Sequence, residues 1–72
     1  MSRVVDCRGL ACPEPVLLAR QALQEAGGGS VMVLVSSSVA RDNVTRAARQ
    51  MGWTSAVEED GVGFRLKLER IN

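Results

Sequence analysis

The sequence predicts an α/β (α+β) two-layer sandwich, in which two helices cover one face of a mixed four-stranded sheet. Two β-type runs alternate with two helix-length segments in the first part of the chain, a pattern typical of parallel strands joined by helical crossovers. An Asp-Gly pair then separates two further strand-like runs, as in a hairpin. Crossovers between parallel strands are right-handed, so both helices should lie on the same face. The expected order is β-α-β-α-β-β.

The composition limits the classes of function. A chain of 72 residues is enough for one small domain, which we expect over residues 1–72. The net charge of +1 and the scarcity of aromatic residues disfavour direct nucleic-acid binding. No apolar run approaches the roughly 20 residues of a membrane span, and no signal-peptide pattern opens the chain, so we expect a cytoplasmic protein without membrane contact. Two cysteines and no histidine provide none of the usual zinc-ligand sets, and we expect neither metal nor cofactor.

The first half of the chain predicts a strand, a helix and a second strand. Arg3–Asp6 is a short β-branched run, and Val16–Ala26 consists of good helix formers ended by three glycines. Val31–Val35 is uninterruptedly apolar, which indicates a central strand with a parallel neighbour. The expected buried stripe of the helix is Val16, Ala19, Leu23 and Ala26, with Arg20, Gln21, Gln24 and Glu25 facing water.

Leu17 and Leu18 fall outside that stripe, and we expect at least one of them to be partly exposed near the Cys12 end. The interpretation we favour is that both reach the edge of the core, because a small sheet leaves a wide apolar flank. The alternative is an exposed surface that docks a partner.

The second half of the chain predicts a helix and a hairpin. Ser36–Ser38 offers N-cap residues for a helix from about Val39 to Met51, which Gly52 ends. Thr54–Glu58 is the expected third strand. A tight hairpin turn at Glu59-Asp60-Gly61 should lead into a strand in which Phe64, Leu66 and Leu68 are buried and Arg65, Lys67 and Glu69 are exposed. The apolar face of the second helix is Val44, Ala47, Ala48 and Met51, while Arg41, Arg46 and Arg49 lie off it and are expected to be solvated, with an anion or partner site as the alternative.

The chemically distinctive stretch is Cys12-Pro13-Glu14-Pro15. Proline restricts the residue before it but suits the first helical turn, so Cys12 is predicted as the N-cap of the first helix. Backbone N–H groups and the helix dipole then favour the thiolate, which is the nucleophilic form. Pro13 and Pro15 donate no hydrogen bond and Glu14 is anionic, so we expect the pKa of Cys12 to be only moderately lowered, with Arg8 as a compensating charge.

The residues before Cys12 have supporting roles in this interpretation. Gly9 is expected to adopt a conformation closed to other residues, and Leu10 to pack on the first helical turn. Cys7, at the end of the first strand, is more simply a small buried residue than a second nucleophile. Its spacing from Cys12 is not that of a Cys-x-x-Cys redox motif.

The pattern Asp6-x-x-Gly9-Leu10-x-Cys12-Pro13-x-Pro15 resembles the signature of the TusA/SirA/YedF family of small sulfur-carrier proteins, and the likeness extends over essentially the whole chain. The Ser-rich turn and the following residues 39–44 look closer to the YedF branch. The resemblance implies a fold like the C-terminal domain of translation initiation factor 3. It also implies that Cys12 carries a persulfide, received from a cysteine desulfurase or rhodanese and passed to an acceptor protein.

Two functional hypotheses follow. In the first, the chain is a persulfide carrier rather than a self-sufficient multiple-turnover enzyme, and Arg8, Leu17 and Arg41 tune the thiol or contact partners. In the second, it is a regulatory interaction module that uses Leu17, Leu18 and the arginines of the second helix. The pathway served is left open: tRNA thiolation, molybdenum-cofactor synthesis, sulfur oxidation or selenium metabolism.

Overall fold

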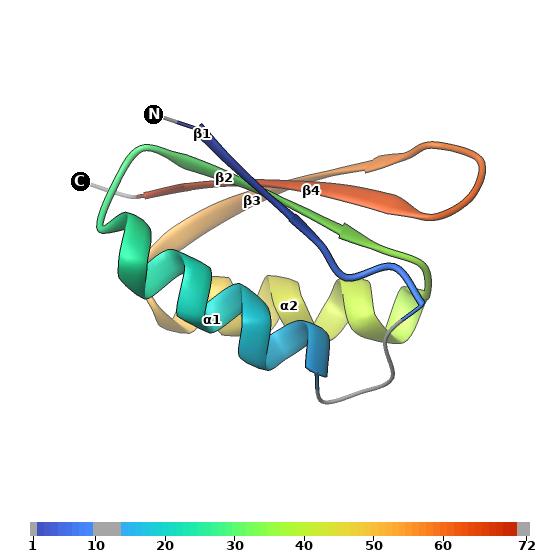
Figure 1. The fold of residues 1–72 in the computed structure, drawn as a ribbon, viewed down its shortest axis with the longest axis horizontal. Helices are drawn as coiled ribbons and strands as arrows, with labels where there is room; N and C mark the ends of the chain where they lie inside the picture. Colours follow the sequence, from blue (N-terminus) through green and yellow to red (C-terminus); the bar gives the residue numbers. More distant parts are fainter. Residues whose placement is uncertain (1, 10–13, 71–72) are drawn as a thin grey trace.

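The six expected elements are present in the expected order. A computed structural model describes residues 2–9 and 14–70, with the side chains of Ser2 and Glu14 left out of the description. The elements are β1 (Ser2–Asp6), α1 (Glu14–Ala26), β2 (Ser30–Val35), α2 (Ser38–Gln50), β3 (Trp53–Glu59) and β4 (Phe64–Arg70). Both helices lie on one face of the sheet (Figure 1). The predicted two-layer fold is therefore confirmed.

The sheet order is β1-β2-β4-β3, with β1 parallel to β2 and the other two pairs antiparallel. The predicted parallel neighbour of β2 is confirmed. Burial nevertheless alternates along β2, with Val31, Val33 and Val35 buried and the residues between them only partly covered. The reason is that the helices cover a single face, so every second side chain points to the open face.

Helix α1 begins at Glu14, and its inner side is wider than the predicted stripe. Ala19 and Leu23 are buried as predicted, whereas Val16 and Ala26 are partly covered. Pro15 and Ala22 are buried as well, although the predicted stripe omitted them. The four predicted polar positions all face water.

Helix α2 shows which of the three serines is the cap. The Ser37 side chain accepts a hydrogen bond from the Ala40 amide at 3.1 Å, so the helix starts at Ser38. Ala40 joins the predicted apolar face, because Val44, Ala47 and Ala48 are buried and Met51 packs against the core. Gly52 follows with a φ of +84°, a left-handed conformation that ends the helix.

The β3–β4 connection differs from the predicted tight turn. Strand β3 ends at Glu59 and β4 starts at Phe64, so four residues form the loop. The Asp60 carboxylate accepts hydrogen bonds from the amides of Val62 and Gly63, and the Asp60 amide donates to the Gly63 carbonyl. The aspartate side chain thus closes a longer loop, as aspartates commonly do in turns. Buried Leu66 and Leu68 and partly covered Phe64 follow the predicted alternation.

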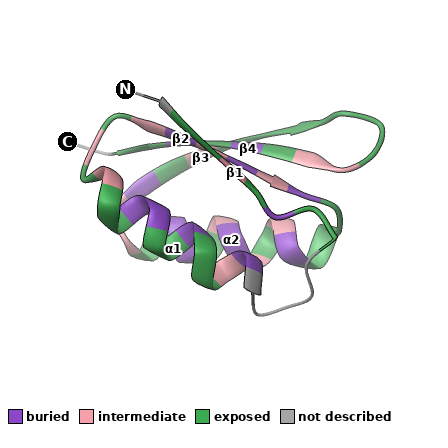
Figure 2. Ribbon diagram, in the orientation of Figure 1, coloured by how far each residue is buried: buried purple, intermediate pink, exposed green. Residues whose placement is uncertain are grey.

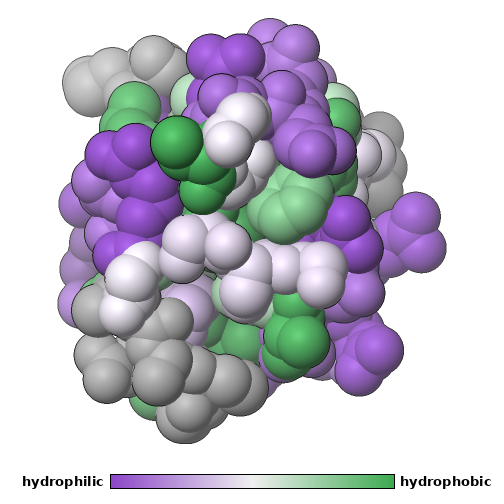
Figure 3. All heavy atoms as spheres, turned by 90° about the vertical axis from the view of Figure 1, so that its right-hand side faces the viewer, coloured by the Kyte–Doolittle hydropathy of each residue, from purple (hydrophilic) through white to green (hydrophobic). Residues whose placement is uncertain are grey.

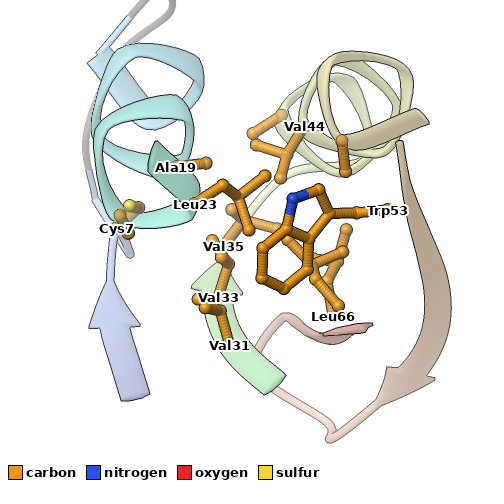
Figure 4. Packing of buried hydrophobic residues seen from close by; sticks show 13 residues of the cluster. Cys7, Ala19, Leu23, Val31, Val33, Val35, Val44, Trp53 and Leu66 are labelled. Carbon is orange, nitrogen blue, oxygen red and sulfur yellow. The ribbon is translucent and has the colours of Figure 1, made fainter. Parts of the chain in front are cut away.

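The core lies between the helices and the sheet. Trp53, at the start of β3, is only 1% exposed and is the largest buried side chain. Its indole points among side chains of α1, α2 and the central strands (Figure 4). Burial is concentrated on the inner faces of the helices and on the sheet side that they cover (Figure 2), and Cys7, directly after β1, is buried as well. None of the described helices is long and apolar enough to cross a membrane.

Candidate functional site

One edge of the sheet gathers the starts of both helices. Because β1 and β2 are parallel, with Asp6 beside Leu34, their carboxyl ends stop at the same edge. The β3–β4 loop turns at this edge too, since Val35 pairs with Phe64. Figure 1 shows the exits of β1 and β2 and the hairpin at the same end of the molecule. Residues distant in sequence therefore surround the chain that leads toward Cys12.

The exit of β1 is held by an ion pair between Asp6 and Arg8. The guanidinium donates from Nε to Oδ1 at 3.0 Å and from Nη2 to Oδ2 at 2.9 Å, and the Arg8 amide donates to Oδ1 at 3.1 Å. The hydrogen bonds from the Arg8 side chain, followed by the one from its amide, lower the pKa of Asp6 to about 2, and the same carboxylate raises the pKa of Arg8. The Arg8 charge is thus engaged by Asp6, and its predicted offset of the Glu14 charge at the Cys12 thiol stays a prediction.

Cys7 and Gly9 connect this exit to β2. The Cys7 amide donates to the Leu34 carbonyl at 2.8 Å, and the Gly9 amide donates to Ser36 Oγ at 3.0 Å. Gly9 has a φ of +81°, which agrees with the conformation predicted for it. The segments that follow β1 and β2 therefore stay hydrogen-bonded to each other beyond the last paired residues of the two strands.

The Cys7 thiol is part of the core. Its residue is only 1% exposed, and burial together with the charge of Asp6 raises the pKa of the thiol. A buried protonated thiol is a poor nucleophile. Cys7 is thus the small buried residue that the sequence predicted.

Several predicted site residues lie outside the described part of the chain. They are Leu10, Cys12 and Pro13, so the predicted N-cap role of Cys12 stays a prediction. Glu14 is described only as the first residue of α1, and Pro15 is buried in its first turn. Along the chain, Cys12 follows Gly9 by three residues and precedes the start of α1 by two.

Leu17 and Leu18 correct the interpretation we favoured. Leu17 is 59% exposed and Leu18 38%, so neither is enclosed by the core. Pro15, Ala19 and Leu23 occupy the inner side of α1. Because of the helix periodicity, Leu17 and Leu18 then lie on its outer side. They form an exposed apolar flank on the first turns of α1.

Arg41 makes side-chain contacts that a fully solvated arginine would not make. Its guanidinium lies over the Phe64 ring, 4.8 Å from the centroid, and its Nε donates to Asp42 at 2.9 Å. Arg46 and Arg49 are exposed as predicted. Arg41 thus packs α2 against β4, a contact that helix periodicity alone does not reveal.

Ser36 and Gly63 are the site residues that sequence reasoning missed. Ser36 was one of three candidate caps, and nothing in the pattern indicated that its hydroxyl faces Gly9. Gly63 lies so close to the end of β2 that a Cβ on it would overlap the Val35 carbonyl oxygen and stand 3.1 Å from Ser36 Cα. Figure 3 looks onto this end of the molecule, where a pale band of near-neutral hydropathy separates strongly hydrophobic patches.

Among the described residues, no three of His, Cys, Asp and Glu are grouped so as to hold a metal ion.

Comparison with known proteins gives a consistent result. A family model described as "Sulfurtransferase TusA" matches residues 3–70. An Archaeoglobus fulgidus protein named "Putative sulfur carrier protein" is 38% identical over 63 residues, which are 81% of this chain and 80% of that protein. A Bacillus subtilis protein with the same description, YrkI, is 28% identical and covers 90% of this chain and 87% of its own length.

A solved structure agrees in three dimensions. The crystal structure of a SirA-like protein from Desulfitobacterium hafniense superimposes with a TM-score of 0.85 at 36% sequence identity. The match covers 93% of this chain and 95% of that one. The likeness therefore extends over nearly the whole fold.

Proposed function

The chain belongs to the TusA sulfurtransferase family, and on that premise we propose that it is a sulfur carrier whose persulfide forms on Cys12. The observation that carries the assignment to Cys12 is the burial of the other thiol. Cys7 is 1% exposed with a raised pKa, and the sequence holds two cysteines in all. Cys12 stands in the Cys-Pro-Glu-Pro stretch within the region that the family model matches.

The transfer needs no cofactor and no net oxidation. The Cys12 thiolate attacks the outer sulfur of a donor cysteine persulfide, the donor S–S bond breaks, and the donor cysteine leaves as a thiolate. An acceptor thiolate later attacks the outer sulfur now on Cys12, and the Cys12 thiolate leaves. One S–S bond forms as another breaks in each step, so the sulfane sulfur keeps its oxidation state. A moderately stabilised thiolate suits both steps, because it must attack and then leave.

The partners follow from this chemistry. The donor is a protein that forms a persulfide on its own cysteine, such as a cysteine desulfurase or a rhodanese. The acceptor is a protein with a reactive thiol in tRNA thiolation, molybdenum-cofactor synthesis, sulfur oxidation or selenium metabolism. We place Asp6, Gly9, Leu10, Pro13, Glu14 and Pro15 in the support of Cys12, and Arg8, Leu17 and Arg41 among the residues that tune the thiol or contact partners.

Loading with sulfur tests this proposal directly. The purified chain is incubated with a cysteine desulfurase and L-cysteine, and intact-protein mass spectrometry follows the added mass. We expect one sulfur atom on the wild type and on Cys7→Ser, removed by dithiothreitol, and none on Cys12→Ser. A wild-type chain that stays unloaded with both a desulfurase and a rhodanese, or a Cys12→Ser variant that loads equally, refutes the proposal.

The exposed flank of Leu17 and Leu18 supports a second candidate, a regulatory module that binds a partner through α1. The two candidates separate in a strain that lacks the gene. If the carrier function is correct, Cys12→Ala abolishes complementation. If the regulatory function is correct, Cys12→Ala complements fully and Leu17→Glu does not.

A further inference from the structure

We propose that Ser36 is a positioning residue for Cys12, because its hydroxyl fixes the chain at Gly9 just before the segment that carries the reactive thiol. The inference rests on the proposed function only in taking Cys12 as the reactive thiol. It deepens that function by assigning a role to a residue of β2's exit, far from the Cys-Pro-Glu-Pro stretch in sequence.

The first argument is the succession of backbone hydrogen bonds after β1. The Cys7 amide donates to the Leu34 carbonyl, the Arg8 amide to the Asp6 carboxylate and the Gly9 amide to Ser36 Oγ. Three consecutive amides are thus satisfied. The bond to Ser36 is the last described link before residues 10–13, and it joins positions 27 residues apart.

The second argument is that Ser36 itself is held from several sides. Val35, before it, is completely buried at the end of β2. Ser37, after it, caps α2 through the Ala40 amide. Gly63 of the β3–β4 loop approaches so closely that it has no room for a Cβ next to Val35 and Ser36. The backbone that carries the Ser36 hydroxyl is thus held by a strand, a helix and a hairpin loop.

The third argument is the short chain between the anchor and the thiol. Three residues reach at most about 11 Å, so a change at Gly9 acts within that distance of the Cys12 backbone. Gly9 in a left-handed conformation has no side chain to restrain it, and the Ser36 bond compensates for that. The N-cap role that the sequence predicts for Cys12 would stabilise its thiolate, and we expect loss of the anchor to weaken that stabilisation.

The three consecutive serines supply matched variants for a test. Ser36→Ala removes the anchor, Ser36→Thr keeps an acceptor hydroxyl, and Ser37→Ala removes the helix cap instead. Ser38→Ala alters an exposed serine whose side chain makes no hydrogen bond within the described part of the chain. The full chain is used throughout. NMR follows hydrogen exchange of the Gly9 amide, and peptide mass spectrometry follows alkylation of Cys12 by iodoacetamide across pH.

For Ser36→Ala we expect Gly9 exchange to accelerate about two- to tenfold, the range that the loss of one hydrogen bond implies. We also expect alkylation of Cys12 at neutral pH to slow by a similar factor, with its pH midpoint moved upward. Ser36→Thr should restore both values, and Ser37→Ala and Ser38→Ala should leave the Cys12 midpoint unchanged.

Each other result overturns the inference. If Gly9 exchanges faster in Ser36→Ala but the Cys12 midpoint stays, Ser36 is only structural. If Ser37→Ala shifts the midpoint equally, the effect is a general loosening of the fold. Neither measurement involves a persulfide, so failure here is distinct from failure of the loading experiment.

Discussion

The pair Leu23→Ala and Leu17→Ala tests how α1 is held on the sheet. Both changes remove the same three carbon atoms from the same helix, and alanine is the best helix former, so helix propensity contributes little to the difference. Leu23 is 1% exposed and lies in the core, whereas Leu17 is 59% exposed. The comparison therefore separates the effect of side-chain burial from the effect of the chemical change itself.

The expected magnitude follows from burial. Three buried carbon groups at about 0.8 kcal/mol each give roughly 2.4 kcal/mol of lost transfer free energy. The cavity left behind raises the total to about 3–4 kcal/mol, inside the usual range for a buried leucine. A chain of 72 residues has a free energy of unfolding on the order of 4–11 kcal/mol, so Leu23→Ala should remove a large share of it. For Leu17→Ala we expect about 1 kcal/mol or less.

Urea unfolding followed by fluorescence measures both values. The chain has a single tryptophan, and buried Trp53 reports on the core that Leu23 helps to form. We expect the Leu23→Ala midpoint to fall by about 1 M or more, and the slope with urea to stay unchanged. Equal losses for the two variants, or a loss below about 1 kcal/mol for Leu23→Ala, would show that α1 is not packed as described.

Two further predictions concern the sheet edge. Ser37→Ala should lower the free energy of unfolding by about 1 kcal/mol through loss of the cap, while Ser38→Ala stays near the wild type in thermal melts; a Ser37→Ala melt that matches the wild type contradicts the cap. The pKa of Asp6 is lowered to about 2 in the folded chain, so its pair with Arg8 stabilises the fold above the ordinary carboxyl pKa and loses this effect as the pH falls through about 2. Asp6→Asn should therefore have a lower free energy of unfolding than the wild type near neutral pH and the same value below about pH 2. Urea titrations that give the same difference in free energy of unfolding at every pH would refute this.

The order of the elements could be predicted because local patterns decide it. The alternation of β4, the apolar run of β2 and the glycines after each helix act within a few residues of where they stand. Burial of Cys7 was also predictable, because a free cysteine behaves as a small hydrophobic residue. Family membership followed from the motif around Cys12, whose spacing is local too.

Contacts between distant segments could not be predicted in the same way. Trp53 fell outside the predicted third strand, yet it is the largest residue of the core. Leu17 and Leu18 face outward because other residues of α1 fill its inner side. Arg41 lies over Phe64 because α2 crosses β4 there.

The sequence alone determined which elements form, in what order, and which thiol stands in a motif of carrier proteins. Only the tertiary structure brought Gly63, Ser36 and Gly9 together at one edge of the sheet. Caps, periods and turns depend on residues a few positions apart, so they can be read along the chain. The approach of a hairpin loop to a strand exit depends instead on how whole elements pack, and packing is settled by side chains from every part of the sequence at once.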